Sequence, residues 1–154
     1  MYVKNRLLAI LGLLLIFFSA IPGETQEFEH NFPPHAIIIA SYRGDDALLR
    51  DLLDAGVDMY VKDALGATAL HLAMFQSNLV VVKMLLDQGF DPNIRDIKHG
   101  YTPLHNAVVA NNPGAARLLV AYGASKYARD LNGHTPLDKA RKDEKGAMVS
   151  LLSR

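Results

Sequence analysis

Residues 102–105 read Thr-Pro-Leu-His, and this stretch decides the fold because the chain repeats it in register. The earlier copy is Thr-Ala-Leu-His at 68–71 and the later one is Thr-Pro-Leu-Asp at 135–138, at steps of 34 and 33 residues. A Leu-Leu-x-x-Gly sequence at 52–56 and 85–89 follows the same period. A period of about 33 residues that starts in this way is typical of stacked helix–loop–helix units.

Each unit is predicted to contain two short helices. In the second unit, Thr68 is suited to cap the first helix and Asn78 to cap a second helix over 79–87. Gly89 ends that helix because glycine adopts the left-handed conformation without steric cost. The apolar side chains of the second helix are expected in the core: Val80, Val81, Val82, Met84 and Leu85.

Short stretches between the units are predicted to form hairpin-like loops on one side of the stack. Each closes with an aspartate, at Asp63, Asp96 and Asp130, followed by a glycine. Because these aspartates recur with the repeat, we interpret them as turn residues and not as acid–base groups. The second loop carries one extra residue, which explains the 34-residue step. The loops cover three ranges: 58–66, 91–100 and 125–133.

The chain resembles ankyrin-repeat proteins over residues 33–154, on the motifs at 100–105 and 85–89 and on Asp-Pro-Asn at 91–93. The resemblance implies an all-α solenoid of about four helix-turn-helix units with projecting hairpin loops. Members of this family mostly bind other proteins in a curved groove, so it also implies a non-enzymatic binding module. The units would cover about 33–65, 66–99, 100–132 and 133–154.

The first 23 residues predict an export signal. Lys4 and Arg6 precede an uncharged run over 7–18, and small and helix-breaking residues follow at 19–23. The run is shorter than the ~20 apolar residues that a spanning helix needs. Residues 24–32 then form an acidic linker.

An uncleaved N-terminal anchor is the alternative to a cleaved signal. A cut after Ala20 would place Phe18 three residues before the cleavage site, and a cut after Gly23 would place Ile21 there, and neither residue is small. A short ankyrin array behind such a segment resembles the small exported ankyrin proteins of Gram-negative bacteria. We therefore expect the protein in the periplasm or secreted, or, if uncleaved, anchored in the inner membrane and facing the periplasm.

Composition excludes several function classes. The chain has no cysteine, which rules out thiol chemistry and lipoprotein acylation. Without residues 1–23 it carries 14 basic and 16 acidic residues, whereas nucleic-acid binding usually shows as strong positive charge. We expect a monomer with a protein partner, no nucleic acid, and membrane contact only through an uncleaved N-terminal segment.

The histidines do not predict a metal site. The resemblance implies that His71 and His105 hydrogen-bond loop backbone and join adjacent units. His99 and His134 lie on predicted hairpin tips without a nearby cluster of ligands. No serine lies in a nucleophile-elbow pattern and no glycine-rich phosphate loop follows a strand, so we predict no catalytic residue and no cofactor.

A basic residue precedes each hairpin aspartate, at Lys62, Arg95 and Arg129. Stacking would align them in one column at the groove edge, where basic and aromatic side chains suit an acidic, partly apolar partner. The alternative is that each base pairs with its neighbouring aspartate as solvated turn charge. The predicted partner-binding residues are Tyr42, Arg43, Lys62, Leu65, Phe75, Gln76, Arg95, Lys98, His99, Tyr101, Arg129 and His134.

Two narrower roles remain open at the level of sequence. One is an immunity-like inhibitor that neutralises a periplasmic toxin or enzyme. The other is an accessory to oxidative-stress defence that touches haem or catalase assembly, which predicts haem uptake dependent on His99 or His134.

Overall fold

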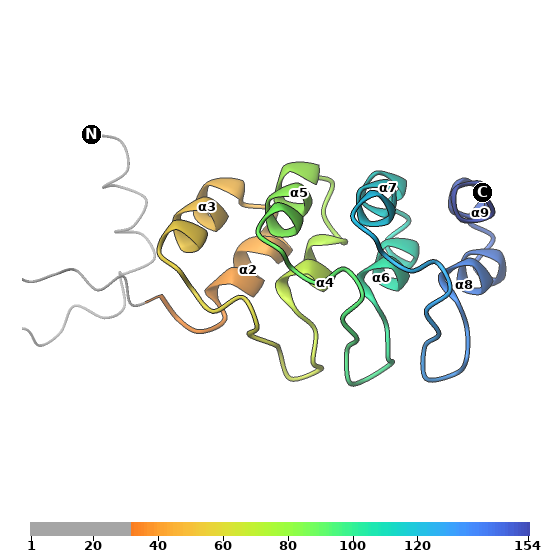
Figure 1. The fold of residues 1–154 in the computed structure, drawn as a ribbon, viewed down its shortest axis with the longest axis horizontal. Helices are drawn as coiled ribbons and strands as arrows, with labels where there is room; N and C mark the ends of the chain where they lie inside the picture. The colour runs from red at the N-terminus through yellow and green to blue at the C-terminus, as the bar shows by residue number, and fades with distance from the viewer. Residues whose placement is uncertain (1–31) are drawn as a thin grey trace, which may run out of the picture.

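The computed structural model describes residues 32–154, and it consists there of four helix pairs in a single row (Figure 1). The predicted signal peptide, and the predicted linker up to residue 31, lie outside the described residues. Within the described part all regular elements are helices, as the repeat predicted. The pairs are α2 (Ala36–Arg43) with α3 (Asp46–Asp54), α4 (Ala69–Ala73) with α5 (Leu79–Asp87), α6 (Pro103–Val109) with α7 (Pro113–Ala121), and α8 (Pro136–Lys142) with α9 (Gly146–Leu152).

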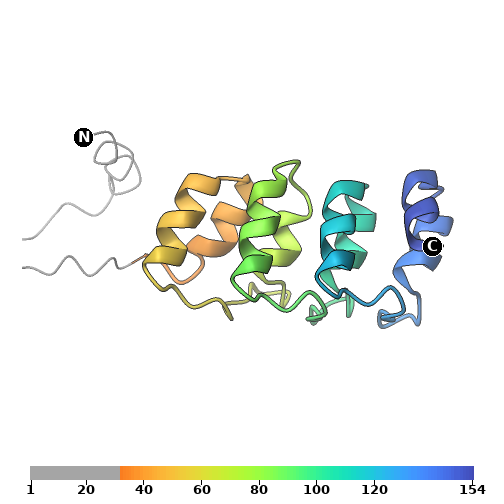
Figure 2. The ribbon, with the colours of Figure 1, turned by 45° about the horizontal axis from the view of Figure 1, so that its top comes forward.

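The helices form two layers. The first helices of the units, α2, α4, α6 and α8, pack on one another in series and are called the inner helices. The second helices, α3, α5, α7 and α9, pack in the same order as the outer helices. The loops that connect successive units all project to the same side of the stack (Figures 1 and 2). Each unit therefore contacts mainly its neighbours, as in other repeat proteins.

Side-chain caps start the outer helices α5 and α7 and also join each of them to the preceding unit. The Asn78 side chain accepts a hydrogen bond from the Val80 amide at 3.1 Å, and its amide nitrogen donates to the Gly44 carbonyl of unit one at 2.9 Å. Asn112 accepts from the Ala115 amide at 3.0 Å and donates to the Gln76 carbonyl of unit two at 2.7 Å. The cap predicted at Asn78 is confirmed, and the same side chain fixes the stacking.

The core lies between the two layers. Leucines at repeat positions, such as Leu70 and Leu85, are fully buried. Val80 was predicted to be buried and is half exposed, so that prediction is wrong. The helical period explains the difference, because Val81, Val82 and Leu85 occupy the inward face of α5.

No helix within residues 32–154 has the length and apolar character needed to cross a membrane.

Candidate functional site

Each hairpin is built around a carboxylate that holds the loop backbone. Asp63 accepts hydrogen bonds from the amides of Leu65 and Ala67 at 2.8 and 2.9 Å. Asp96 does the same in the second hairpin and Asp130 in the third. Burial alone would raise the pKa of Asp130, but the backbone amides outweigh it and lower that pKa. These contacts confirm that the recurring aspartates are turn residues.

Backbone hydrogen bonds link neighbouring hairpins into one edge. The Ile97 amide donates to the Leu65 carbonyl at 2.9 Å, and the Leu131 amide donates to the His99 carbonyl at 2.8 Å. Ile97 lies directly over Gly66, where an added Cβ would come within 2.5 Å of its Cγ1 atom. The three hairpins therefore form a connected edge whose tips have fixed relative positions.

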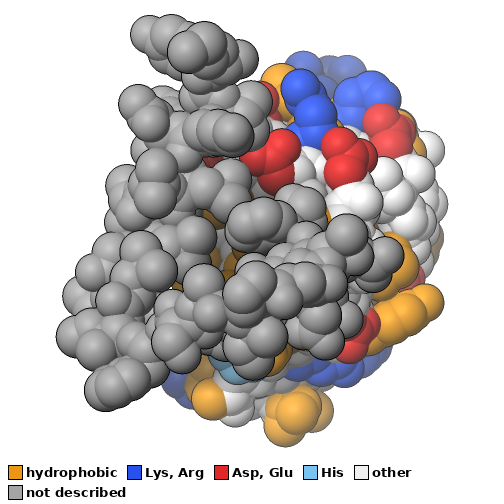
Figure 3. Space-filling model, turned by 90° about the vertical axis from the view of Figure 1, so that its left-hand side faces the viewer, with side chains coloured by type: hydrophobic (Ala, Val, Ile, Leu, Met, Phe, Trp, Pro, Cys, Tyr) orange, Lys and Arg blue, Asp and Glu red, His pale blue; other side chains and the backbone are white. Residues whose placement is uncertain are grey.

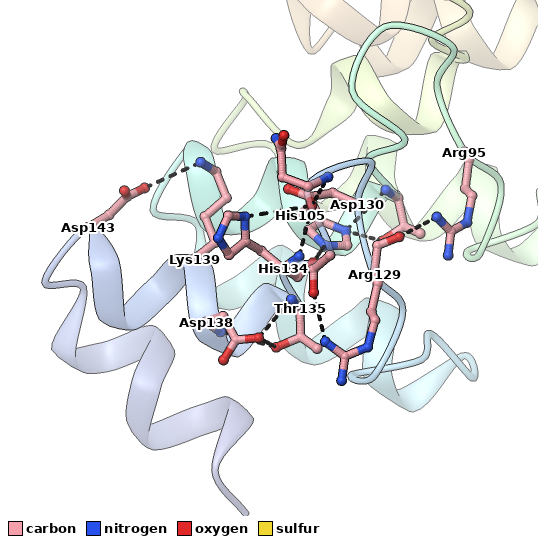
Figure 4. A network of polar contacts seen from close by, with 12 residues as sticks. Arg95, His105, Arg129, Asp130, His134, Thr135, Asp138, Lys139 and Asp143 are labelled. Carbon is pink, nitrogen blue, oxygen red and sulfur yellow. Dashed lines mark hydrogen bonds and ion pairs between the residues drawn. The ribbon is translucent and has the colours of Figure 1, made fainter.

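The predicted basic column is exposed, but its cations do not pair with the adjacent aspartates. The Arg95 guanidinium donates to the Arg129 carbonyl of the next hairpin, and Arg129 donates to the Gly133 carbonyl at 2.7 Å (Figure 4). Lys62 makes no hydrogen bond or ion pair with another described residue. Two of the three cations thus help to hold the hairpins, and the Lys62 ammonium is free to meet a partner.

His71 and His105 are buried struts between units. The Nδ1 atom of His71 accepts from the Thr68 amide at 3.2 Å, and its Nε2 atom donates to the Tyr101 carbonyl of the next hairpin at 3.0 Å. His105 bonds Thr102 and the His134 carbonyl in the same way. A carbonyl can only accept, so Nε2 carries a proton, and a backbone amide can only donate, so Nδ1 carries none. Each ring is therefore a neutral imidazole with its proton on Nε2.

Burial lowers the pKa of both histidines, which keeps them neutral. These contacts confirm the role that the resemblance implied for His71 and His105. Within residues 32–154, no three His, Asp or Glu side chains are grouped so that they could hold a metal ion.

The fourth unit uses a carboxylate where the second and third use a histidine. Asp138 accepts hydrogen bonds from the Thr135 amide at 3.0 Å and the Thr135 hydroxyl at 2.7 Å (Figure 4). These bonds lower the pKa of Asp138. A carboxylate that is ionised cannot donate a hydrogen bond, so Asp138 reproduces the cap within the unit but not the bond that points to a following unit.

Tyr101 is a packing residue more than a hairpin tip. Its ring stacks between His99 and His105, at centroid distances of 4.9 and 5.3 Å, and the Lys139 ammonium lies 5.4 Å from the ring centroid. The tyrosine is half-buried as a result. It contributes to a binding surface mainly by holding His99 in place.

The other predicted residues are accessible. All of the twelve are exposed except Gln76 and Tyr101, which are half-buried. Tyr42 and Arg43 lie at the C-terminal end of α2, Phe75 and Gln76 lie in the turn that follows α4, and the remainder lie on the hairpins. The predicted set therefore lies on two adjoining surfaces, the hairpin edge and the ends of the inner helices.

Sequence reasoning missed four exposed residues on these surfaces. Ile97 and Leu131 protrude from the hairpins and are 75% and 69% exposed. Figure 3, a view along the stack, shows hydrophobic side chains at the lower edge, on the side to which the hairpins project. Val109 and Lys142 occupy the positions in units three and four that Phe75 occupies in unit two. Val109 and Lys142 could have been found in the sequence by comparing the position of Phe75 across all units, whether or not the residue there is aromatic.

A shallow pocket of about 310 Å³ lies beside this surface, between the inter-helix turns of units two and three. Phe75 and Gln76 form one wall, and Ala110 and Pro113 form the other. The volume is at the lower end of the ~300–1,000 Å³ typical of small-molecule sites.

Comparison with known proteins agrees with this geometry. A model of ankyrin repeats (3 copies) matches residues 37–130. The tyrosine-protein kinase HTK16 of Hydra vulgaris is 31% identical over 118 residues, which cover 76% of this chain and 16% of the kinase. The mouse B-cell lymphoma 3 protein homolog is 35% identical over 109 residues, 68% of this chain and 24% of that protein.

The mouse inhibitor of Bruton tyrosine kinase is 36% identical over 83 residues, 54% of this chain and 6% of that protein. The chain spans a quarter or less of the length of each of these relatives. The shared part is the repeat array, a module that typically binds proteins and is not catalytic. With its four stacked helix pairs, its Thr–His struts and its linked hairpins, the chain belongs to the ankyrin-repeat family.

Proposed function

We propose that this protein binds one partner protein on the surface formed by the hairpin edge and the inner helices, without catalysing a reaction, after export to the periplasm. One observation carries the proposal. Exposed basic side chains recur at equivalent hairpin positions, and Tyr42 and Phe75 occupy equivalent positions in units one and two, on a scaffold whose units are joined by hydrogen bonds. A rigid surface of this kind loses little conformational entropy when a partner binds.

The comparisons support a binding role in general terms. The inhibitor of Bruton tyrosine kinase, by its name, acts on another protein, and its match to this chain covers repeats. The exported location rests on the sequence of residues 1–23, where a basic start precedes a short apolar run.

Charge reversal with a matched control tests the binding role. The bait is the full chain with a C-terminal tag, incubated with periplasmic extract. Lys62 and Lys98 are exposed on the hairpins and make no side-chain bond within the described part, so the variant is Lys62→Glu with Lys98→Glu. The control is Arg50→Glu with Arg117→Glu, the same charge change on the outer helices α3 and α7.

A single protein retained by the unchanged chain and by the control, and lost by the hairpin variant, supports the proposal. Loss with both variants would indicate a bulk charge effect, and equal retention by all three would place the site elsewhere. Intact-mass measurement of the periplasmic protein tests export separately. A chain that begins between residues 21 and 24 supports cleavage, whereas an intact chain in the membrane fraction supports an anchor.

A further inference from the structure

The ends of the inner helices change in character along the stack. Tyr42, Phe75 and Val109 occupy equivalent positions in units one, two and three and are 54%, 44% and 37% exposed. The equivalent residue in unit four is Lys142, an exposed cation without an ion-pair partner in the described chain. At this position the residue is therefore apolar in the first three units and positively charged in the fourth.

A second row of equivalent positions, one helical turn earlier, changes in the same order. Ile39 in unit one is 44% exposed and Leu72 in unit two is half-buried. Asn106 in unit three is polar, and its amide nitrogen lies 3.5 Å from the His71 carbonyl. Lys139 in unit four is cationic. Asn106 is buried and Lys139 is half-buried beside Asp143, so only Ile39 of this row is exposed and the change in surface character rests on the first row.

Most acidic groups near this surface already have partners within the protein. Asp63, Asp96 and Asp130 each accept two backbone amides inside their own hairpin. Asp143 lies 3.9 Å from the Lys139 ammonium and 3.4 Å from that of Lys145. Glu144, exposed in the turn after α8, makes no ion pair with a described residue, whereas on α8 itself the exposed charges are those of Arg141 and Lys142.

We propose that the partner contributes a segment of fixed polarity, which lies along the stack with apolar side chains on units one to three and carboxylates on unit four. This inference rests on the proposed function and specifies the partner at the same surface. Apolar side chains at the centre of an interface supply most of the affinity, and charge complementarity fixes register and orientation.

The spacing of the units restricts the backbone of the segment. Packed helices lie ~8–10 Å apart, so Tyr42, Phe75 and Val109 are separated by about that distance in each step. Seven residues of an α-helix rise ~10.5 Å and return to the same face, and three residues of a polyproline II helix rise ~9.3 Å. A β-strand repeats its face every ~6.6–6.8 Å, which does not match. The apolar residues should therefore recur at steps of seven or three.

The experiment uses a phage library of random 20-residue peptides, selected against the full-length protein in mild detergent. Enriched peptides should carry apolar residues at steps of seven or three, and Asp and Glu should be more frequent at one end than at the other. Carboxylates spread evenly along the peptide, or an absence of acidic enrichment, would overturn the proposed order. Alternating apolar residues at steps of two would overturn the proposed spacing.

One enriched peptide is then synthesised, and its affinity for variants of the protein is measured by titration. Two variants show which end of the peptide lies on which unit. Phe75→Ala should weaken binding roughly 30-fold, as loss of an aromatic anchor does. The matched control is Val80→Ala, at a 51% exposed apolar residue on the outer helix α5, and it should leave binding unchanged. Lys142→Glu should weaken binding about fivefold, and changing the terminal Glu residues of the peptide to Lys should restore it.

The outcomes separate this inference from the function on which it rests. Peptides that need Phe75 but bind Lys142→Glu as well as the unchanged chain overturn the order and leave the binding surface standing. Peptides that bind the Phe75→Ala and the Lys62→Glu, Lys98→Glu variants without loss overturn both, as does a library that yields no binder. Thermal unfolding of each variant confirms that it is folded.

Discussion

Leu104 shows at the scale of one residue how the repeat motif stabilises the fold. Its side chain is fully buried in the core that the two helix layers share. We expect Leu104→Ala to lower the free energy of unfolding by ~2–5 kcal/mol, through lost burial and the cavity that remains. Urea denaturation measures this, with the exposed Val109→Ala as a control that should change little. No loss at Leu104 would contradict the core described above.

Ser41 is the opposite case, because its hydroxyl is buried without a hydrogen-bond partner in the described chain. The equivalent positions in units two and three hold Met74 and Val108, which are apolar and buried. Ser41→Ala should raise the free energy of unfolding by about 1 kcal/mol, since it removes an unsatisfied polar group. Thr102→Ala should lower it by about 1 kcal/mol, since that hydroxyl bonds to His105 at 2.9 Å. Thermal denaturation of both variants would reject this account if Ser41→Ala were the less stable one.

Local side-chain roles could be predicted wherever they depend on near neighbours in sequence. The cap at Asn78 and the turn aspartates were predicted correctly because their partners lie within a few residues. Partners in the next unit could not be predicted in the same way. The spacing of Arg95 and Arg129 predicts a column, but it does not reveal that Arg95 donates to the Arg129 carbonyl.

At the scale of an element, two glycines with similar backbone angles should respond differently to substitution. Gly66 has φ of 76° and Gly89 has φ of 89°. An added Cβ at Gly89 would meet no atom within 4 Å, but at Gly66 it would lie 2.8 Å from the Ile97 amide nitrogen. Gly89→Ala should therefore cost ~1–2 kcal/mol from backbone strain alone.

Gly66→Ala should cost at least about 1 kcal/mol more, because the Cβ also separates two linked hairpins. Chemical denaturation of the two single variants gives the difference directly. Equal losses would mean that the hairpins move apart freely, which their mutual hydrogen bonds argue against.

Helices were easier to predict than the surfaces they present. The second helix of unit two was predicted over 79–87, and α5 covers the same residues. Its capping residue and its terminal glycine are both explicit in the sequence. Exposure of Val109 and Lys142 depends instead on how far each neighbouring unit reaches, which is a property of the stack.

At the scale of the whole molecule, two buried neutral histidines couple stability to pH. Burial lowers the pKa of His71 and His105 below the ordinary value of 6.5. Below about pH 6.5 the unfolded chain therefore binds protons that the folded chain does not. The contribution of the two neutral histidines to the free energy of unfolding is complete above that pH. It is lost as the pH falls towards their lowered pKa values in the folded state.

We expect the free energy of unfolding to decrease between pH 7 and pH 5, with a slope that approaches ~1.4 kcal/mol per pH unit for each histidine. Asp130 and Asp138 have pKa values below the ordinary 3.8, so they matter only in stronger acid. Urea denaturation at half-unit pH steps tests this. His105→Gln should reduce the slope, and a flat profile in the unchanged protein would show that the rings are accessible to protons.

Asp138 changes the number of hydrogen bonds that the fourth unit can form with neighbouring units. Units two and three both cap themselves and reach forward, through His71 and His105, to the hairpin that follows. The fourth unit accepts such a bond at the His134 carbonyl. Its Asp138 carboxylate cannot donate an equivalent bond to the hairpin of another unit. Lengthening the array by design would therefore begin with Asp138→His, before any copy of unit three is appended.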